Sequence, residues 1–245
     1  FYPNREKATL LLKQSLNVCR HIRALEKPEV RAAMQDEAPL IVHVVRQYLP
    51  NRGGLDAVVA NLCGELIGSG YRVRVVTLDR LFGAPDKTLA AREIISGVEV
   101  VRIPWRGSNR YPLALSVFKH FKDADIVHVH AIDFFFDALA WGWPLHRKPM
   151  VVTTHGGFFH TKRFAKLKTA WFNTVSRMSS LAYRRIICCS QADKRLFDTI
   201  AASRTVQIEN GADTGKFSDA AAKTPTPGMI TIGRFSANKQ IPRLL

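Results

Sequence analysis

Short runs of Val and Ile alternate with helical patterns along most of this 245-residue chain, and this alternation limits its fold more than any other feature. Several runs are almost continuously β-branched, as strands require when helices cover both faces of a sheet. Strands and helices that alternate at this spacing predict an α/β fold with a doubly wound parallel sheet. The expected strands are residues 40–45, 72–78, 98–104, 125–131, 150–155, 185–190 and 206–210, and the clearest helical patterns are 55–67, 159–183 and 191–201.

The same reading divides the chain into four expected segments. Residues 1–38 have mixed charges and no strand-like run, so we expect a helical N-terminal extension, followed by the main domain at 39–218. The stretch DAAAKTPTPG, residues 219–228, mixes small residues with two prolines and predicts a linker. Residues 229–245 begin with the strand-like MITIGRF and read as the start of a second domain. We therefore expect the chain to be truncated.

The chain is strongly basic, with 36 Lys and Arg against 20 Asp and Glu and a net charge of +16. Nucleic acid, anionic lipid and phosphorylated substrates all attract such a charge. Most of the excess falls between residues 141 and 195, where Asp193 is the single acid among many Lys and Arg. None of the known combinations of basic and aromatic residues that bind nucleic acid occurs, so we expect no nucleic-acid partner. A basic nucleic-acid-binding protein remains an alternative that rests on net charge alone.

No segment offers about 18 uncharged apolar residues, so we expect a soluble or peripheral protein rather than a membrane-spanning one. The four cysteines, Cys19, Cys63, Cys188 and Cys189, lack metal-ligand spacing. Adjacent cysteines seldom meet the geometry of a disulfide, and a reducing compartment is the simplest interpretation.

The stretch VVTTHGGFFH, residues 151–160, ends a predicted strand on His155 and continues with Gly156 and Gly157. Ligands of open α/β sheets bind beyond the carboxyl ends of the strands. A neutral imidazole at this edge can donate or accept a hydrogen bond, and glycines leave room for a substrate. His155 is therefore the candidate catalytic residue, with Gly156 as a candidate substrate-binding residue.

Two further pairs suit a phosphorylated ligand. Gly53 and Gly54 separate a predicted strand from a predicted helix. The bare backbone and the free N–H groups at a helix start favour the binding of an anion. The alternative is that the two glycines only form a tight structural turn. Arg234 and Lys239 follow the strand of the second domain and could clamp a diphosphate. All four are candidate substrate-binding residues.

His128 and His130 lie two residues apart on a predicted strand and therefore share one face. A metal-dependent hydrolase that uses this pair with Asp133 and His155 is an alternative function, because imidazoles on a common face can reach one ion. No further ligand cluster completes such a site, so we expect no metal. We expect histidines that line a cleft, with His130 in contact with the substrate.

These stretches together resemble the retaining glycosyltransferases of the GT-B fold, family four, through the glycines after the first strand, the HGG loop, ENGADTGKF (209–217) and GRFSANK. Longer segments, HVVRQYLPNRGGLDAVV, VRIPWRGSNRYPLA and HAIDFFFDALA, resemble the exopolysaccharide mannosyltransferases that extend a cellobiosyl-diphosphopolyprenol with mannose from GDP-mannose. The resemblance implies that residues 39–218 form the Rossmann-like N-terminal domain of a GT-B enzyme.

The resemblance also implies a function. GDP-mannose would be the nucleotide-sugar co-substrate, with no further cofactor, and a polyprenyl-diphosphate-linked oligosaccharide would be the acceptor. His155 would hydrogen-bond the transferred sugar, Gly53 and Gly54 would line the cleft, and Arg234 and Lys239 would hold the donor diphosphate. The enzyme would be cytoplasmic and peripheral, on an anionic membrane surface at the inner face of the cell membrane.

The sequence departs from the family pattern in two places. The usual Lys-Gly pair is Lys239-Gln240 here, and the Glu-x7-Glu motif of the family lies later in the second domain than this sequence extends. We therefore expect the 245 residues alone to be inactive.

Overall fold

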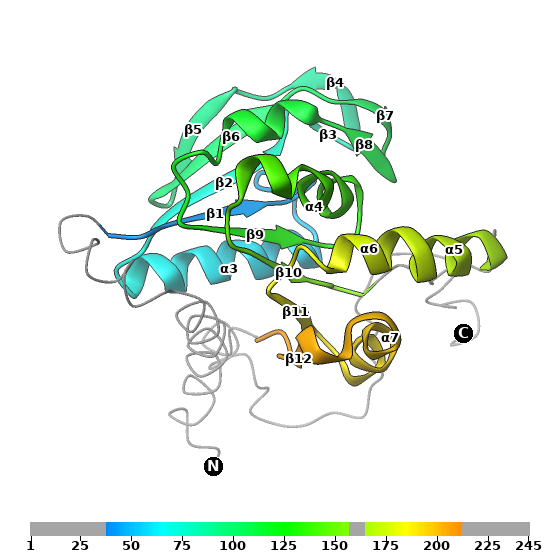
Figure 1. Ribbon diagram of the computed structural model, residues 1–245. Helices are drawn as coiled ribbons and strands as arrows, with labels where there is room; N and C mark the ends of the chain where they lie inside the picture. The colour runs from blue at the N-terminus through cyan, green and yellow to red at the C-terminus, as the bar shows by residue number, and fades with distance from the viewer. Residues whose placement is uncertain (1–37, 157–164, 212–245) are drawn as a thin grey trace, which may run out of the picture. The chain divides into compact units, whose positions relative to one another are not determined.

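The computed structural model describes residues 38–156 and 165–211 (Figure 1). The first half of this region contains β1 (Leu40–Val44), α3 (Gly54–Gly68), β2 (Arg72–Leu78), β3 (Arg80–Leu81), β4 (Ala84–Thr88), β5 (Arg92–Ile95), β6 (Val98–Ile103), β7 (Arg106–Ser108), β8 (Tyr111–Leu113) and the 3-10 helix η1 (Leu115–Lys119). The second half contains β9 (Ile126–His130), α4 (Phe134–His146), β10 (Met150–Thr153), α5 (Ala165–Trp171), the π-helical turn η2 (Phe172–Ser176), α6 (Arg177–Ser180), β11 (Arg185–Cys188), α7 (Gln191–Ala201), the 3-10 helix η3 (Ala202–Arg204) and β12 (Thr205–Gln207).

The main sheet has the strand order β12-β11-β10-β9-β1-β2-β6-β5 (Figure 1). Its neighbouring strands are parallel except for β5, which pairs antiparallel with β6 at the edge. The chain builds outward from β1 to one side through β2 and β6, and to the other side through β9, β10, β11 and β12. The predicted doubly wound α/β sheet is therefore confirmed, and the carboxyl ends of β1, β9 and β10 lie side by side.

Helices cover both faces of this sheet because alternate residues of each strand point to opposite sides. Along β1, Val42 and Val44 join a core shared with α4 and α7, whereas Ile41 joins a core shared with α3. Each strand residue of β1 is buried, which is why the sequence there is an almost continuous apolar run.

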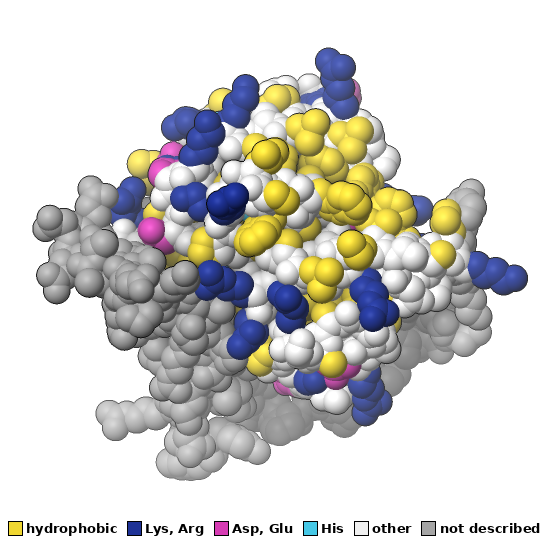
Figure 2. All heavy atoms as spheres, in the orientation of Figure 1, with side chains coloured by type: hydrophobic (Ala, Val, Ile, Leu, Met, Phe, Trp, Pro, Cys, Tyr) yellow, Lys and Arg dark blue, Asp and Glu magenta, His cyan; other side chains and the backbone are white. Residues whose placement is uncertain are grey.

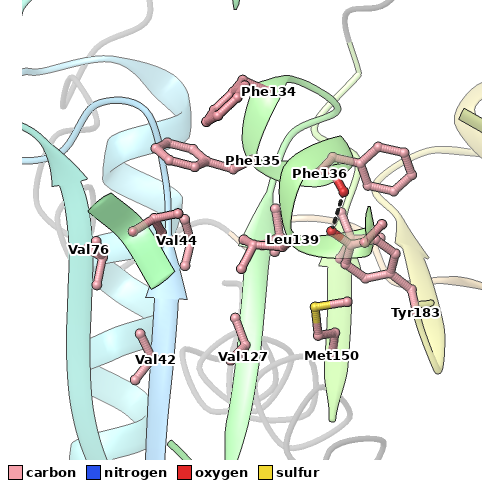
Figure 3. Packing of buried hydrophobic residues seen from close by; sticks show 14 of the residues in the cluster. Val42, Val44, Val76, Val127, Phe134, Phe135, Phe136, Leu139, Met150 and Tyr183 are labelled. Carbon is pink, nitrogen blue, oxygen red and sulfur yellow. Dashed lines mark hydrogen bonds between the residues drawn. The ribbon is translucent and has the colours of Figure 1, made fainter. Parts of the chain in front are cut away.

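The core beneath α4 is built from large aromatic side chains (Figure 3). Phe135, Phe136 and Leu139 on α4 are fully buried above the strands. The ring of Tyr183 stacks on Phe136, with centroids 4.9 Å apart, and its hydroxyl donates a hydrogen bond of 2.8 Å to the carbonyl oxygen of Phe136. This stack and hydrogen bond connect the first turn of α4 to the segment that leads into β11.

The segment predicted to be helical, 159–183, is helical from residue 165 to residue 180 in its described part, but not as one regular α-helix. Its described part contains α5, η2 and α6, and the π-helical turn interrupts the 3.6-residue period on which the prediction was based. Phe172, Ser176 and Ser179 are buried, whereas the apolar Trp171 and Met178 are exposed. Phe172 therefore belongs to the buried face of this segment, whereas Trp171 and Met178 do not.

Only parallel strands were predicted from the sequence, so several smaller elements were missed. The antiparallel strand β5 and the hairpins β3–β4 and β7–β8 are short and largely exposed, and they lack the long Val and Ile runs of the main sheet. The expected extension at 1–38, the linker at 219–228 and the second-domain start at 229–245 fall outside the described residues, apart from residue 38.

Candidate functional site

The predicted site residues that the structure describes lie at one edge of the sheet. Gly53 and Gly54 follow β1 at the start of α3, His130 ends β9, and His155 and Gly156 follow β10. These strands are neighbours in the order β10-β9-β1, so their carboxyl ends meet at the same edge, where ligands bind in folds of this class. Arg234 and Lys239 lie outside the described residues.

The loop before α3 is held in place by Asp56. Asp56, in the first turn of α3, accepts hydrogen bonds from the Gly53 N–H at 2.9 Å and from the Asn51 side chain. This arrangement orders the turn in place of a side-chain cap. Among the described residues, a Cβ added at Gly54 would meet no atom within 4 Å beyond its chain neighbours and its own helix, so no side chain crowds this backbone.

His155 adopts an unusual backbone conformation, with φ of +52°, followed by Gly156 with φ of +71°. Residues other than glycine seldom occupy this left-handed region. Both neighbours of His155 bind Asp193: the Thr154 hydroxyl donates to Oδ2 at 2.7 Å, and the Gly156 N–H donates to the same oxygen at 3.0 Å. Asp193 thus holds the backbone on both sides of His155.

In the sequence, Asp193 stands out only as the single acid in a basic segment. It occupies the first turn of α7, where the N-cap Ser190 accepts a hydrogen bond from the Asp193 N–H. The sequence spacing Ser-x-x-Asp before a helix is a recognised N-terminal capping pattern and could have placed Asp193 at a helix start. Its contact with the His155 loop depends on the neighbouring positions of β10 and β11.

Three buried histidines lie directly beneath His155. His43 on β1 is paired with His128 on the neighbouring strand β9, so their side chains lie on the same face of the sheet. His130 lies two residues after His128 and therefore points to that face as well. His43 Nδ1 lies 2.9 Å from His130 Nε2, and His130 Nδ1 lies 2.9 Å from His155 Nε2. His128 Nε2 instead lies 2.7 Å from the Thr153 hydroxyl. The structure confirms that His128 and His130 share a face, but it buries both rather than exposing them in a cleft.

Burial keeps these imidazoles uncharged. It lowers the pKa of His43 to about 3 and the pKa of His155 to about 4. The pKa values of His128 and His130 also fall well below the ordinary value, chiefly through burial and further through neighbouring imidazoles. At pH 7 each ring therefore carries one N–H and one lone pair.

This burial predicts a steep loss of stability in mild acid. The folded pKa values lie below the value of about 6.5 for an unfolded imidazole, so the stabilisation is complete above pH 6.5 and is lost as the pH falls toward about 4 for His155 and about 3 for His43. Each such histidine contributes a slope of up to about 1.4 kcal/mol per pH unit in this window.

Urea unfolding at pH 7.0, 6.0 and 5.0 measures this slope. We expect the variant His43→Gln to lose less stability between pH 6 and pH 5 than the parent chain, by up to about 1.4 kcal/mol, because one protonation linked to unfolding is removed. Parallel pH profiles for the two proteins would contradict the assignment of a buried neutral His43.

The structure does not bring together all four residues of the hydrolase site considered as an alternative. Nitrogen atoms of His43, His128 and His130 lie within 4.8 Å of one another, a spacing that could hold a metal ion. Asp133, however, caps α4 through the Phe135 N–H at 2.9 Å and forms an ion pair with Arg46 at 2.7 Å. Asp133 is therefore engaged elsewhere, and the histidine cluster contains His43, which was not among the predicted residues.

Comparison with known proteins identifies the family. Residues 52–216, more than half of the chain, match the model of Glycosyltransferase Family 4. The chain belongs to glycosyltransferase family 4. Within this family, it is 45% identical over 210 residues to a protein of Komagataeibacter xylinus and 48% identical over 201 residues to a protein of Xanthomonas campestris. Both relatives are named GDP-mannose:cellobiosyl-diphosphopolyprenol alpha-mannosyltransferase.

These matches cover 85% and 81% of this family 4 chain, and the chain spans about half the length of the relatives, 53% in each case. A solved structure described as trehalose-6-phosphate from E. coli bound with UDP-2-fluoro glucose has the same fold, with a TM-score of 0.50 over 77% of this chain and 52% of that chain at 13% identity. The Rossmann-like architecture of a GT-B N-terminal domain is thereby confirmed.

Proposed function

We propose that the protein to which this chain belongs transfers mannose from GDP-mannose, with retention, onto a cellobiosyl-diphosphopolyprenol during exopolysaccharide synthesis. The observation that carries the proposal is the identity of 45–49% to three relatives with that name, over 81–85% of this chain. Family membership favours glycosyl transfer over the metal-dependent hydrolase.

Family membership suggests the proposed roles, and the positions of His155, Gly54 and Gly156 at the ligand edge of the sheet support theirs. His155 hydrogen-bonds the transferred sugar, and Gly54 and Gly156 leave space beside the backbone. The leaving diphosphate develops negative charge, and stabilising such charge is usually the largest electrostatic contribution to a reaction of this kind. Arg234 and Lys239 supply the positive charge, so the proposed reaction requires neither a metal ion nor another cofactor.

An assay of the extended protein tests the reaction. We define this protein as the present chain joined to the remaining part of the Komagataeibacter xylinus relative. It is incubated with GDP-mannose and with a cellobiosyl-diphosphopolyprenol, and UDP-glucose serves as the alternative donor. Mannose transfer supports the proposal. Transfer from UDP-glucose but not from GDP-mannose would show that the donor is a different nucleotide sugar. A folded protein that is inactive with every nucleotide sugar would overturn the proposed function.

The acceptor is a lipid, and one surface of the described region suits a lipid bilayer. Exposed apolar side chains project from α4 and from the segments on either side of it, since α4 contacts both β8 and α6. We call this set the apolar face, and Figure 2 shows hydrophobic side chains gathered there with Lys and Arg around them. Its residues are Leu113, Leu115, Trp141, Trp143, Leu145, Met178 and Leu181.

The charge around the apolar face favours anionic headgroups over a protein partner or nucleic acid. No Asp or Glu occurs from residue 138 to residue 192, whereas Arg147 and Arg177 are exposed beside the apolar side chains. Each Lys or Arg near an anionic surface contributes about 1 kcal/mol to binding, and Trp prefers the boundary between headgroups and acyl chains. No helix in the described ranges is long and apolar enough to cross a membrane. We propose peripheral attachment at the cytoplasmic face of the inner membrane.

The double variant Trp143→Ser/Leu145→Ser tests this attachment. The Leu145 side chain is 92% exposed, so little stability depends on it, and burying one such side chain in lipid is worth roughly 1.5–3 kcal/mol. We expect binding to phosphatidylglycerol vesicles, measured by co-sedimentation, to fall at least about tenfold.

Ile94→Ser is the matched control, because Ile94 is 77% exposed on the edge strand β5, outside the apolar face. We expect it to leave vesicle binding unchanged. Equal binding by the double variant and the parent would reject the apolar face, and equal binding to phosphatidylcholine vesicles would reject the role of the basic charge.

A further inference from the structure

The strongest unexplained feature is the connected set of polar groups beneath and beside His155. Two independent devices act on this residue. One holds its backbone through Asp193, and the other holds its ring through a row of buried histidines. The family match and the relatives' names assign no role to these supporting groups.

The backbone device maintains a conformation that a histidine does not readily adopt alone. A left-handed φ at a residue other than glycine persists only where the surrounding structure enforces it. One carboxylate oxygen of Asp193 accepts hydrogen bonds from the residues immediately before and after His155. Asp193 is itself fixed at the start of α7 by the Ser190 cap, so the loop is tied to a rigid helix.

The ring device is a row of hydrogen bonds that runs from His43 through His130 to His155. A neutral imidazole donates at one nitrogen and accepts at the other. Because His130 uses both of its nitrogens within the row, its two bonds must point in the same direction along the row. Once the direction is set, the proton position on every ring of the row is set as well.

The inner end of the row decides the direction. His43 Nε2 is buried and has no hydrogen-bond partner among the described residues. If the row ran inward, this atom would be a buried N–H without an acceptor, which is rarer in proteins than an acceptor without a donor. The row therefore runs outward: His43 Nδ1–H donates to His130 Nε2, and His130 Nδ1–H donates to His155 Nε2.

The outer end then presents a donor. With Nε2 of His155 accepting from His130, its proton resides on Nδ1, which lies 3.8 Å from the sulfur of Cys189. A thiol is a weak acceptor, so a sugar hydroxyl can replace it at little cost. The fixed proton position makes His155 ready to donate to a substrate without rearrangement of its ring.

We propose that His43, His130 and Asp193 are positioning residues that hold His155 as an Nδ1–H hydrogen-bond donor facing the substrate. This assigns His130 a role behind the reacting groups instead of the direct substrate contact predicted from the sequence. The effect on rate rests on the proposed transferase function, whereas the proton position can be measured without any substrate.

The first test is nitrogen-15 NMR of the histidine rings in the 245-residue chain at pH 7. We expect protonated Nδ1 and unprotonated Nε2 at His43, His130 and His155, and a His155 signal that shifts toward a mixture of tautomers in His43→Leu. His128→Leu is the matched control: it removes an equally buried imidazole that lies outside the row, and it should leave the His155 signal unchanged. Protonated Nε2 at His155, or one stoichiometric metal ion bound to the purified chain, would overturn the proposal.

The second test measures turnover of the extended protein. We expect His43→Leu and Asp193→Ala to lower kcat roughly tenfold to a hundredfold with little change in the KM for the donor, because small displacements of a catalytic group have effects of this size. Asp193→Asn keeps an acceptor oxygen and should recover most of the activity, and His128→Leu should stay within about twofold of the parent. Equal losses of kcat in His43→Leu and His128→Leu would show that the row has only a structural role, and would reject the proposal.

Discussion

His155→Ala is expected to lower kcat of the extended protein by roughly 10²–10³-fold, the usual effect of removing one preorganised hydrogen-bond donor from a reacting centre. The imidazole lies at the ligand edge of the sheet, is neutral, and is held by His130 and by the Asp193 contacts. Its loss would remove the proposed hydrogen bond to the transferred sugar. Steady-state transfer of mannose from GDP-mannose measures the effect.

Two controls separate the loss of the imidazole from a change in the backbone. Alanine tolerates the left-handed φ of +52° poorly, whereas asparagine adopts this region more readily. We therefore expect His155→Asn to keep the fold of the loop and still to lose most of the activity. Full activity in His155→Asn would show that the backbone conformation matters and the imidazole does not, and unchanged activity in His155→Ala would remove His155 from the site.

Phe135→Ala is expected to lower the free energy of unfolding by about 3–5 kcal/mol, the range measured for truncation of a fully buried phenylalanine. Phe135 is completely buried on α4, among the strands and aromatic rings shown in Figure 3. The cavity left in a core of rigid β-branched strand residues and aromatic rings cannot collapse easily. Urea unfolding at pH 7, monitored by tryptophan fluorescence, measures the difference.

Leu145→Ala is the matched control on the same helix, since Leu145 is 92% exposed. We expect its effect to lie within about 0.5 kcal/mol, as for most surface substitutions. A loss below about 1 kcal/mol for Phe135→Ala would mean that α4 is not packed on the sheet as described. A similar loss of unfolding free energy in Phe135→Ala and Leu145→Ala would instead show that shortening any side chain of α4 destabilises the protein, whether or not that side chain is buried.

Much of the main sheet was predictable because its strands are buried on both faces. That burial requires nearly unbroken apolar runs, so β1, β2, β6, β9, β10 and β11 are visible as Val and Ile segments. The amphipathic helix α7 was predicted at its observed bounds for a similar reason, because polar and apolar residues alternate with the helical period. The edge strand β5 and the two small hairpins carry no such pattern, since most of their side chains face water.

The helix α4 shows a different kind of failure. Its sequence, FFFDALAWGWPLH, is apolar around most of its circumference and contains both Gly and Pro, so no helical period marked it. The structure divides these apolar residues between a buried aromatic group and the exposed Trp141, Trp143 and Leu145. Only the packing against the sheet determines which aromatic residues belong to the core and which remain available at the surface.

The sequence alone determined the α/β class, and it placed the candidate site, with His155 and its glycines, at the carboxyl edge of the sheet, because strand ends and glycine-rich turns are local features. The tertiary structure decided what supports that site. His43, His130 and Asp193 come from three distant segments, and they reach His155 only because β1, β9 and β10 are neighbours and α7 begins beside the loop. Strand order and register are properties of the folded sheet, and no local pattern in the chain specifies which buried histidine will face another.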